Sequence, residues 1–369
     1  MNQEKLTYWL TLSSLPNIGW SRAHKLIDLF GSIEKLFQAS FAELTDRNIH
    51  RDIARRICQA DAQNFKSSLN WLQESSQHHI LTPDDNNYPR LLLQSQRPPL
   101  ILYCRGQLEW LHHPQLAIVG SRTPTPAGQQ LAKDFTTELA NAGLIITSGL
   151  ALGIDGIAHR NALSAGAPTV AVAATGLDRV YPARHLTLAK DITHSGIIVS
   201  ELPPGTGVRG TNFPTRNRII AGLSLGVLVV EAAVKSGSLI TAAYAIDNGR
   251  EVFAIPGSVH NSLTKGCHSL IKQGAYLVET AQDILSQLGW LASGQQALNN
   301  QANINEHPSL DSLDDESQML LKQLDYTTTP IDIIVERCEK SVAEVSAKLL
   351  TLELDGWICA VPGGYQRQK

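Results

Sequence analysis

One stretch of the chain is dense in the residue types that bind phosphates and bases. Within ten positions it holds Arg209, Phe213, Arg216, Asn217 and Arg218. Guanidinium groups bind phosphates and an aromatic face stacks on a base, a composition that suits single-stranded nucleic acid. Residues two apart on a helix diverge, so Arg216 and Arg218 need not face the same way, and one of them can pair with Glu231. Phe213 can equally be a core residue.

A second segment, Gly120-Ser121-Arg122, follows a predicted strand. A dinucleotide-binding domain would have G-x-G-x-x-G at this place. Here Pro124 and Pro126 remove amide donors, while Arg122 and Ser121 add side-chain donors. The turn is therefore better suited to gripping a phosphate than to wrapping a dinucleotide.

Two further loops add glycines, hydroxyls and charge. In residues 148–155 we expect Asp155 to cap the following helix, and His159, one turn later, to be a packing or hydrogen-bonding residue. Ser236 and Gly237 make a sharp turn before a helix, where Lys235 adds a cation and the backbone offers an anion site. Glu231 ends a buried strand and is interpreted as the partner of an arginine or as a catalytic carboxylate.

These segments follow short apolar runs that predict buried strands at 116–120, 144–148, 169–173, 196–200, 226–230 and 251–255. Helical patterns lie between them, at 128–142, 157–165, 186–192, 216–223, 239–248 and 270–273. Continuous Val, Ile and Leu runs indicate strands covered on both faces, hence a parallel sheet. Right-handed crossovers then give an α/β, Rossmann-like, doubly wound domain whose ligands bind beyond the carboxyl ends of the strands.

The flanking regions have other patterns. Residues 1–82 are predicted to be a helical domain with no clear strand, including one helix over 51–71, and residues 83–290 form the Rossmann-like domain. A Gln/Asn-rich stretch without Lys or Arg predicts a linker over 291–312. Residues 313–369 give three helices and a two-stranded wing, a winged helix.

Composition limits the class of protein. The chain has 369 residues, 43% of them hydrophobic, with a net charge of −3. This charge argues against a histone-like or polybasic protein but is compatible with a local basic groove. Five scattered cysteines without a C-x-x-C pair argue against zinc ribbons and a disulfide framework. No apolar stretch is long enough to cross a bilayer, and no signal peptide is visible, so a cytoplasmic location without membrane association is expected. We expect no metal and no cofactor.

The motifs in their order along the chain resemble the DNA-processing protein A family (DprA, also called Smf). The resemblance covers about 170 residues, from LAIVGSR through SELPPGTGVRGTNFPTRNRIIAGLS to GCHSLIKQGA. It implies a helical N-terminal domain of sterile-alpha-motif or helix-hairpin-helix type, in which Gly19-Trp20-Ser21 departs from the G-h-G hairpin. It implies a homodimer formed through the Rossmann-like domain that binds single-stranded DNA, protects it in natural transformation, and loads RecA by displacing single-strand-binding protein. No catalysis is implied.

The resemblance also implies roles for individual residues. Gly120, Ser121 and Arg122 would contact phosphates, Phe213 would support a base, and Arg216, Asn217 and Arg218 would line the same pocket. Neighbouring loops contribute Ser148, Gly149, Gly176 and Tyr181. The family often has Asn shortly after its Tyr-Pro pair, where this chain has Ala183-Arg184-His185, so Arg184 is the candidate phosphate contact there.

Two other functions are weighed against this one. Phosphoribohydrolases of the same superfamily use P-G-G-x-G-T-x-x-E, but here the equivalent loop lacks the double glycine and the trailing Glu; release of free base from AMP or CMP would favour that enzyme. A transcription regulator would need a basic recognition helix, yet the candidate helix carries Glu344, Glu353 and Asp355 against Lys348. An accessory role suits the winged helix better.

Overall fold

The protein is described from a computed structural model, which covers residues 2–289, 314–324, 329–338, 341–354, 357–361 and 364–367. The chain divides into two compact units, residues 1–294 and 295–369, and each is described by itself. The predicted linker over 291–312 lies outside the described residues.

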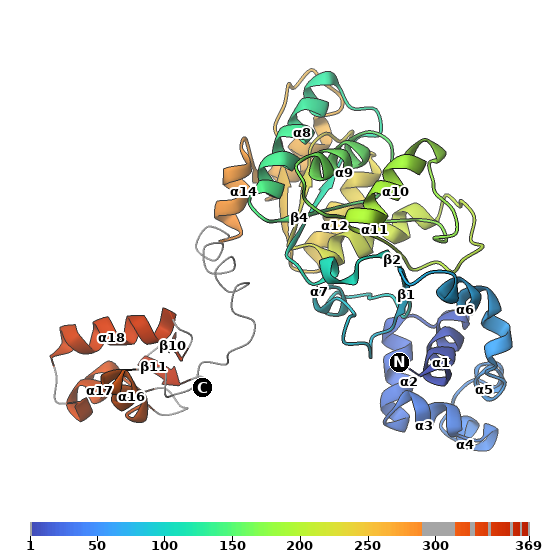
Figure 1. Cartoon of the computed structure of the whole chain (residues 1–369), viewed down its shortest axis with the longest axis horizontal. Helices are drawn as coiled ribbons and strands as arrows, with labels where there is room; N and C mark the ends of the chain where they lie inside the picture. The colour runs from blue at the N-terminus through green and yellow to red at the C-terminus, as the bar shows by residue number, and fades with distance from the viewer. Residues whose placement is uncertain are drawn as a thin grey trace. The chain divides into compact units, whose positions relative to one another are not determined.

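A nine-stranded sheet forms the centre of the first unit, with the order β1-β2-β6-β5-β4-β3-β7-β8-β9. Figure 1 labels β1, β2 and β4 of this sheet. Strands β3 to β9 run parallel to one another. Their bounds are β3 Gln115–Val119, β4 Ile145–Ser148, β5 Thr169–Val172, β6 Ile197–Ser200, β7 Gly226–Val229, β8 Glu251–Ala254 and β9 Tyr276–Leu277. All six predicted strands are confirmed. The order reverses beside β3, which is the doubly wound topology that the sequence predicts.

Two antiparallel strands that the sequence analysis missed extend one edge of the sheet. They are β1 His78–Leu81, which pairs with β2 Leu102–Gly106, and β2 also pairs with β6. The expectation that the first 82 residues hold no strand is therefore wrong. The connector between these strands contains the short helix α7 Arg90–Leu93.

Helices cover both faces of the sheet, because side chains alternate along each strand. In β3, Ala117 and Val119 pack in the same core as helices α11 and α12, whereas Leu116 and Ile118 pack with α8 and α9. The crossover helices are α8 Pro126–Asn141, α9 Ile154–Ser164, α10 Leu186–Ser195, α11 Asn212–Leu223, α12 Gly237–Asp247, α13 Lys265–Lys272 and α14 Ala281–Gln287, with the 3-10 turns η2 Leu108–Leu111 and η3 Ala183–His185. Each predicted crossover helix is present, with its ends shifted.

The N-terminal region is helical, and its core is continuous with one face of the sheet. Its helices are α1 Gln3–Ser14, α2 Trp20–Phe30, α3 Ile33–Gln38, α4 Phe41–Asp46, α5 Arg51–Cys58, η1 Ala62–Phe65 and α6 Lys66–Gln73 (Figure 1). The predicted helix over 51–71 is broken between α5 and α6. Leu100 and Tyr103 pack in one core with Trp9, Leu36 and Trp71, which joins these helices to the first strands.

The second unit is the winged helix that the sequence predicts. It contains α16 Asp315–Lys322, α17 Ile331–Cys338, α18 Val342–Leu354, β10 Ile358–Val361 and β11 Gly364–Arg367, and its two strands pair antiparallel. Leu321, Ile334 and Leu349 lie in its own hydrophobic core.

Candidate nucleic-acid interface

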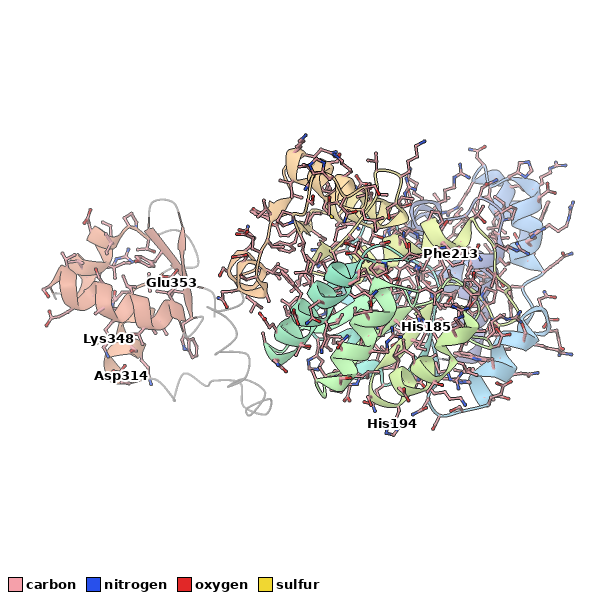
Figure 2. All side chains as sticks on the ribbon, turned by 90° about the horizontal axis from the view of Figure 1, so that it is seen from above. His185, His194, Phe213, Asp314, Lys348 and Glu353 are labelled. Atoms are coloured by element: carbon pink, nitrogen blue, oxygen red, sulfur yellow. The ribbon has the colours of Figure 1, made fainter. Side chains whose placement is uncertain are left out.

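Three side chains from separate loops meet beyond the carboxyl ends of the parallel strands. Arg122 follows β3, Tyr181 follows β5, and Phe213 lies in the first turn of α11, where Figure 2 labels it. The Arg122 guanidinium carbon lies 5.4 Å from the centre of the Phe213 ring, and the Tyr181 and Phe213 rings are 5.7 Å apart. Phe213 is half-buried rather than a core residue, while Arg122 and Tyr181 are exposed. We call these three residues the rim cluster; it presents a cation and two aromatic faces together.

Arg216 lies beneath the rim cluster. Its guanidinium donates to the carbonyl oxygens of Gly149 and Val172, at the carboxyl ends of β4 and β5, and its Nε donates to Asn217. The pKa of Arg216 is lowered to about 10, because burial lowers it more than the neighbouring Asp155 raises it, and the charge of Arg122 adds to the lowering. Arg216 thus remains charged at neutral pH and adds its field to that of Arg122, which favours an anion at the rim.

The loop that follows β4 leaves space for the Arg216 guanidinium. A Cβ atom on Gly149 would lie 2.6 Å from the Arg216 guanidinium, so the approach requires a glycine. The prediction that Asp155 caps α9 is wrong, because the helix begins after Gly153. The Asp155 carboxylate instead accepts from the amides of Gly149 and Ala151. Burial raises the pKa of Asp155. The carboxylate therefore fixes the loop that receives Arg216.

Glu231 has neither of the partners predicted for it. Its buried carboxylate accepts from the backbone amide of Thr125 at 2.9 Å and from the Thr125 hydroxyl at 2.6 Å. It is thus bonded to neither Arg216 nor Arg218 among the described residues, and it holds the end of the Gly120-Ser121-Arg122 turn in place. Thr125 was missed by the sequence analysis, although a threonine directly before Pro126 is a recognisable helix start.

Arg218 faces away from the rim cluster. It forms an ion pair with Glu201 and donates to the carbonyl oxygen of Arg97, on the side of α11 that faces the N-terminal helices. The expectation that Arg216 and Arg218 line one pocket is therefore wrong, because residues two apart on α11 point in different directions.

The other predicted residues differ in how accessible they are. Arg184, Arg209 and Lys235 are exposed, and within the described part of the chain their side chains form no hydrogen bond or ion pair. Ser236 caps α12, and Gly237 accepts from Asn217 through its carbonyl.

Four other predicted residues are buried or bonded within the protein. Ser148 donates to Ile118, Ser121 accepts from the amide of Thr123, Gly176 bonds Thr206, and Gly120 packs on Ile154. The Ser148 side chain has no exposed surface, so its predicted contact with a ligand is wrong.

His159 is a packing and hydrogen-bonding residue, as predicted. The Thr169 hydroxyl donates to the carbonyl oxygen of Ile146, so its oxygen accepts from His159 Nδ1 at 2.8 Å. Among the described residues His159 Nε2 has no hydrogen-bond partner and is buried, and burial lowers the pKa of His159 to about 3.

This histidine makes folding stability depend on pH. Between the unfolded-state pKa of 6.5 and the folded-state value of about 3, the unfolded chain binds the extra proton, so stability falls as pH falls. When the pH drops from about 7.5 to about 5, we expect the free energy of unfolding of the His159→Gln variant to decrease by about 2 kcal/mol less than that of the wild type. Urea denaturation at both pH values measures this difference. Equal losses in the two proteins would contradict a buried neutral His159.

The chain is similar to known proteins over the region that carries the rim cluster. Residues 79–289 match the family described as DNA recombination-mediator protein A, and residues 305–364 match the DprA winged helix domain. The first match covers the sheet and every loop of the rim cluster. The chain belongs to the DprA/Smf family. Protein Smf of Escherichia coli K12 is 43% identical over 85% of this chain and 83% of its own length.

Two solved DprA structures share the fold. The X-ray structure of DprA from Streptococcus pneumoniae aligns with 78% of this chain and 98% of its own, with 36% identity and a TM-score of 0.67. The DprA structure from Helicobacter pylori aligns with 57% of this chain and 95% of its own, with 32% identity and a TM-score of 0.52; its description reports a single-stranded DNA binding mode. Membership of the DprA/Smf family thus covers both units of this chain.

In the winged-helix unit of this DprA/Smf protein, the candidate recognition helix α18 carries Glu344 and Glu353 against a single Lys348. Lys348 of α18 forms an ion pair with Asp314, and Figure 2 labels both residues. Pairing with a carboxylate reduces what this lysine can offer to a phosphate backbone. Across the described residues, no three His, Cys, Asp or Glu side chains cluster as metal ligands, and no helix is both long and apolar enough to span a bilayer.

Proposed function

We propose that this protein binds single-stranded DNA without sequence preference, protects incoming strands, and loads RecA onto them in natural transformation and recombination. The observation that carries the proposal is the rim cluster, because Arg122 supplies a guanidinium while Phe213 and Tyr181 supply stacking faces at one place. Binding by counterion release and stacking requires no bond chemistry, so the proposal includes no catalytic residue, metal or cofactor.

The DNA-binding site that we propose lies in residues 83–290 and extends from the rim cluster to other exposed cations on the surface. Arg184, Arg209 and Lys235 are exposed and serve as phosphate contacts, with the turn of Ser236 and Gly237 beside Asn217. Arg216 acts from below by its charge. The partners are RecA, single-strand-binding protein as the competitor for the strand, and a second copy of this chain joined through the Rossmann-like domain. The location proposed for all of this is the cytoplasm.

A RecA-loading assay tests the proposal. RecA hydrolyses ATP when it assembles on DNA, so single-strand-binding protein that covers the strand delays hydrolysis. Adding the full chain should shorten that delay, and the Arg122→Ala variant should not. An unchanged delay with the wild-type chain, when RecA assembles normally on naked DNA, would contradict RecA loading.

Replacing Phe213 separates stacking from charge. Phe213→Ala should weaken single-strand binding about tenfold, since stacking on an aromatic ring contributes about 1–3 kcal/mol per base. The dependence of affinity on salt should stay the same, because no positive charge is removed. Phe213→Tyr is the matched control and should bind like the wild type. Fluorescence anisotropy over a salt series measures both quantities, and unchanged affinity of Phe213→Ala would show that no base stacks there.

A further inference from the structure

A cavity lies on the side of α11 that faces the N-terminal helices, between these helices and the sheet. Its volume is about 820 Å³. Its walls come from the turn between α1 and α2, from η1 and α6, from the connector that precedes β2, and from the loop that follows β6. Neither the family resemblance nor the rim cluster gives this cavity a role. We call it the N-terminal cavity.

The charges that line the N-terminal cavity favour an anion. Glu201 is the one carboxylate among its lining residues, and it is paired with Arg218. Two other cations remain. Arg97 is exposed, and within the described part of the chain its guanidinium has no hydrogen-bond or ion-pair partner. Arg22 donates one hydrogen bond, at 2.9 Å, to the carbonyl oxygen of Asn17 and keeps its other donors.

The same walls carry aromatic surface. Trp20 and Phe65 line the cavity, and both residues are half-buried. Tyr103 lines it too, but its hydroxyl is bonded to Ser68 at 2.8 Å and the residue is buried. The lining of the cavity thus includes both guanidinium groups and partly exposed rings, the two kinds of group that bind an unpaired strand.

The N-terminal cavity adjoins the rim through shared residues. Glu201 and Leu202 line it, and they also line a smaller hollow of about 100 Å³ together with Thr211, Thr215 and Arg216. The smaller hollow touches the first turn of α11, which carries Phe213. The segment 201–202 therefore borders both hollows and lies between the first turn of α11 and the N-terminal cavity.

We propose that the N-terminal cavity binds the continuation of the single strand held at the rim cluster, with Arg97 and Arg22 on its phosphates and Trp20 against a base. This inference rests on the proposed function and deepens it, since the N-terminal helices become part of the binding site. Continuity with the rim favours a polynucleotide over a free mononucleotide. A strand must then exceed a certain length before it gains the second set of contacts.

Oligonucleotide length provides the test, with the full chain and oligo-dT of about 6 and about 25 nucleotides, a range that brackets typical site sizes. Arg97→Glu should bind the longer strand about tenfold more weakly, since it loses a phosphate contact and adds repulsion, and should bind the shorter strand like the wild type. Arg122→Ala should weaken both. Arg56→Glu, an exposed arginine of α5 outside the cavity, is the matched control and should change neither.

Photocrosslinking gives a readout that does not depend on affinity. The longer strand, substituted with 5-iododeoxyuridine, should crosslink to the peptide containing Trp20, and the shorter strand should not. If Arg97→Glu leaves both affinities unchanged while Arg122→Ala lowers them, the inference is wrong and the proposed function stands. If added dTMP abolishes the crosslink but leaves the affinity for the longer strand intact, the cavity is a mononucleotide site instead. If the wild-type chain binds neither strand, both proposals fail.

Discussion

Arg122→Ala should bind single-stranded DNA about tenfold more weakly than the wild type, to a similar extent for every sequence tested, because a phosphate contact carries no base information. The slope of log affinity against log salt should fall by about 0.7, the value for one lost phosphate contact on a single strand. The fold should survive, since Arg122 is exposed and its described contact is with the Phe213 ring.

Fluorescence anisotropy with oligo-dT and a mixed-sequence strand, over a series of salt concentrations, measures both quantities for Arg122→Ala. Arg56→Ala, an exposed arginine on α5, is the control for general loss of positive charge. An unchanged affinity in a folded Arg122→Ala protein would remove the rim cluster from the binding site. A loss for one sequence alone would indicate base readout instead.

Arg216→Met should have the largest effect on stability. The substitution removes a guanidinium that bonds two backbone carbonyls and the side chain of Asn217, and it leaves the buried Asp155 without its positive neighbour. Two buried backbone carbonyls lose their donor and a buried carboxylate loses its neighbouring cation, and removing one side of a buried charged interaction costs about 3–5 kcal/mol. We expect a decrease of that size in the free energy of unfolding, together with loss of single-strand binding.

A double-mutant cycle with Asp155→Asn separates the charge interaction from the other contacts of Arg216. The double variant should lose less stability than the sum of the two single variants, because each single variant keeps one uncompensated buried charge whereas the double variant keeps none. Urea denaturation at neutral pH gives all four free energies. A decrease below about 1 kcal/mol for Arg216→Met would show that Arg216 is not fixed in the arrangement described.

The parallel part of the sheet could be predicted because each strand is a short apolar run between helical patterns. Strands β1 and β2 lacked that signal. His78 and His79 open β1, Arg105 lies in β2, and turn-forming residues separate the two strands. Both strands pair antiparallel, a geometry that does not require long Val and Ile runs. Local pattern alone therefore left one edge of the sheet undetected.

The position of the candidate site could also be predicted, since parallel strands bring the loops after their carboxyl ends to one edge. The partners within the site could not. Glu231 meets Thr125 across 106 positions of chain, and Arg218 meets Glu201 across the loop that precedes α11. Such pairings depend on how crossovers pack on the sheet. Helical periodicity told us that Arg216 and Arg218 diverge, but it did not tell us which of them lies under the rim cluster.

The central claim is that the rim cluster forms a cationic, aromatic site for an unpaired strand. Equilibrium binding of the full chain to a single-stranded oligonucleotide and to the matched duplex, each over a series of salt concentrations, tests it most directly. We expect tighter binding to the single strand at every salt concentration, with log affinity falling linearly against log salt and little difference between sequences. Equal or tighter binding to the duplex, or an affinity that does not respond to salt, would contradict the claim.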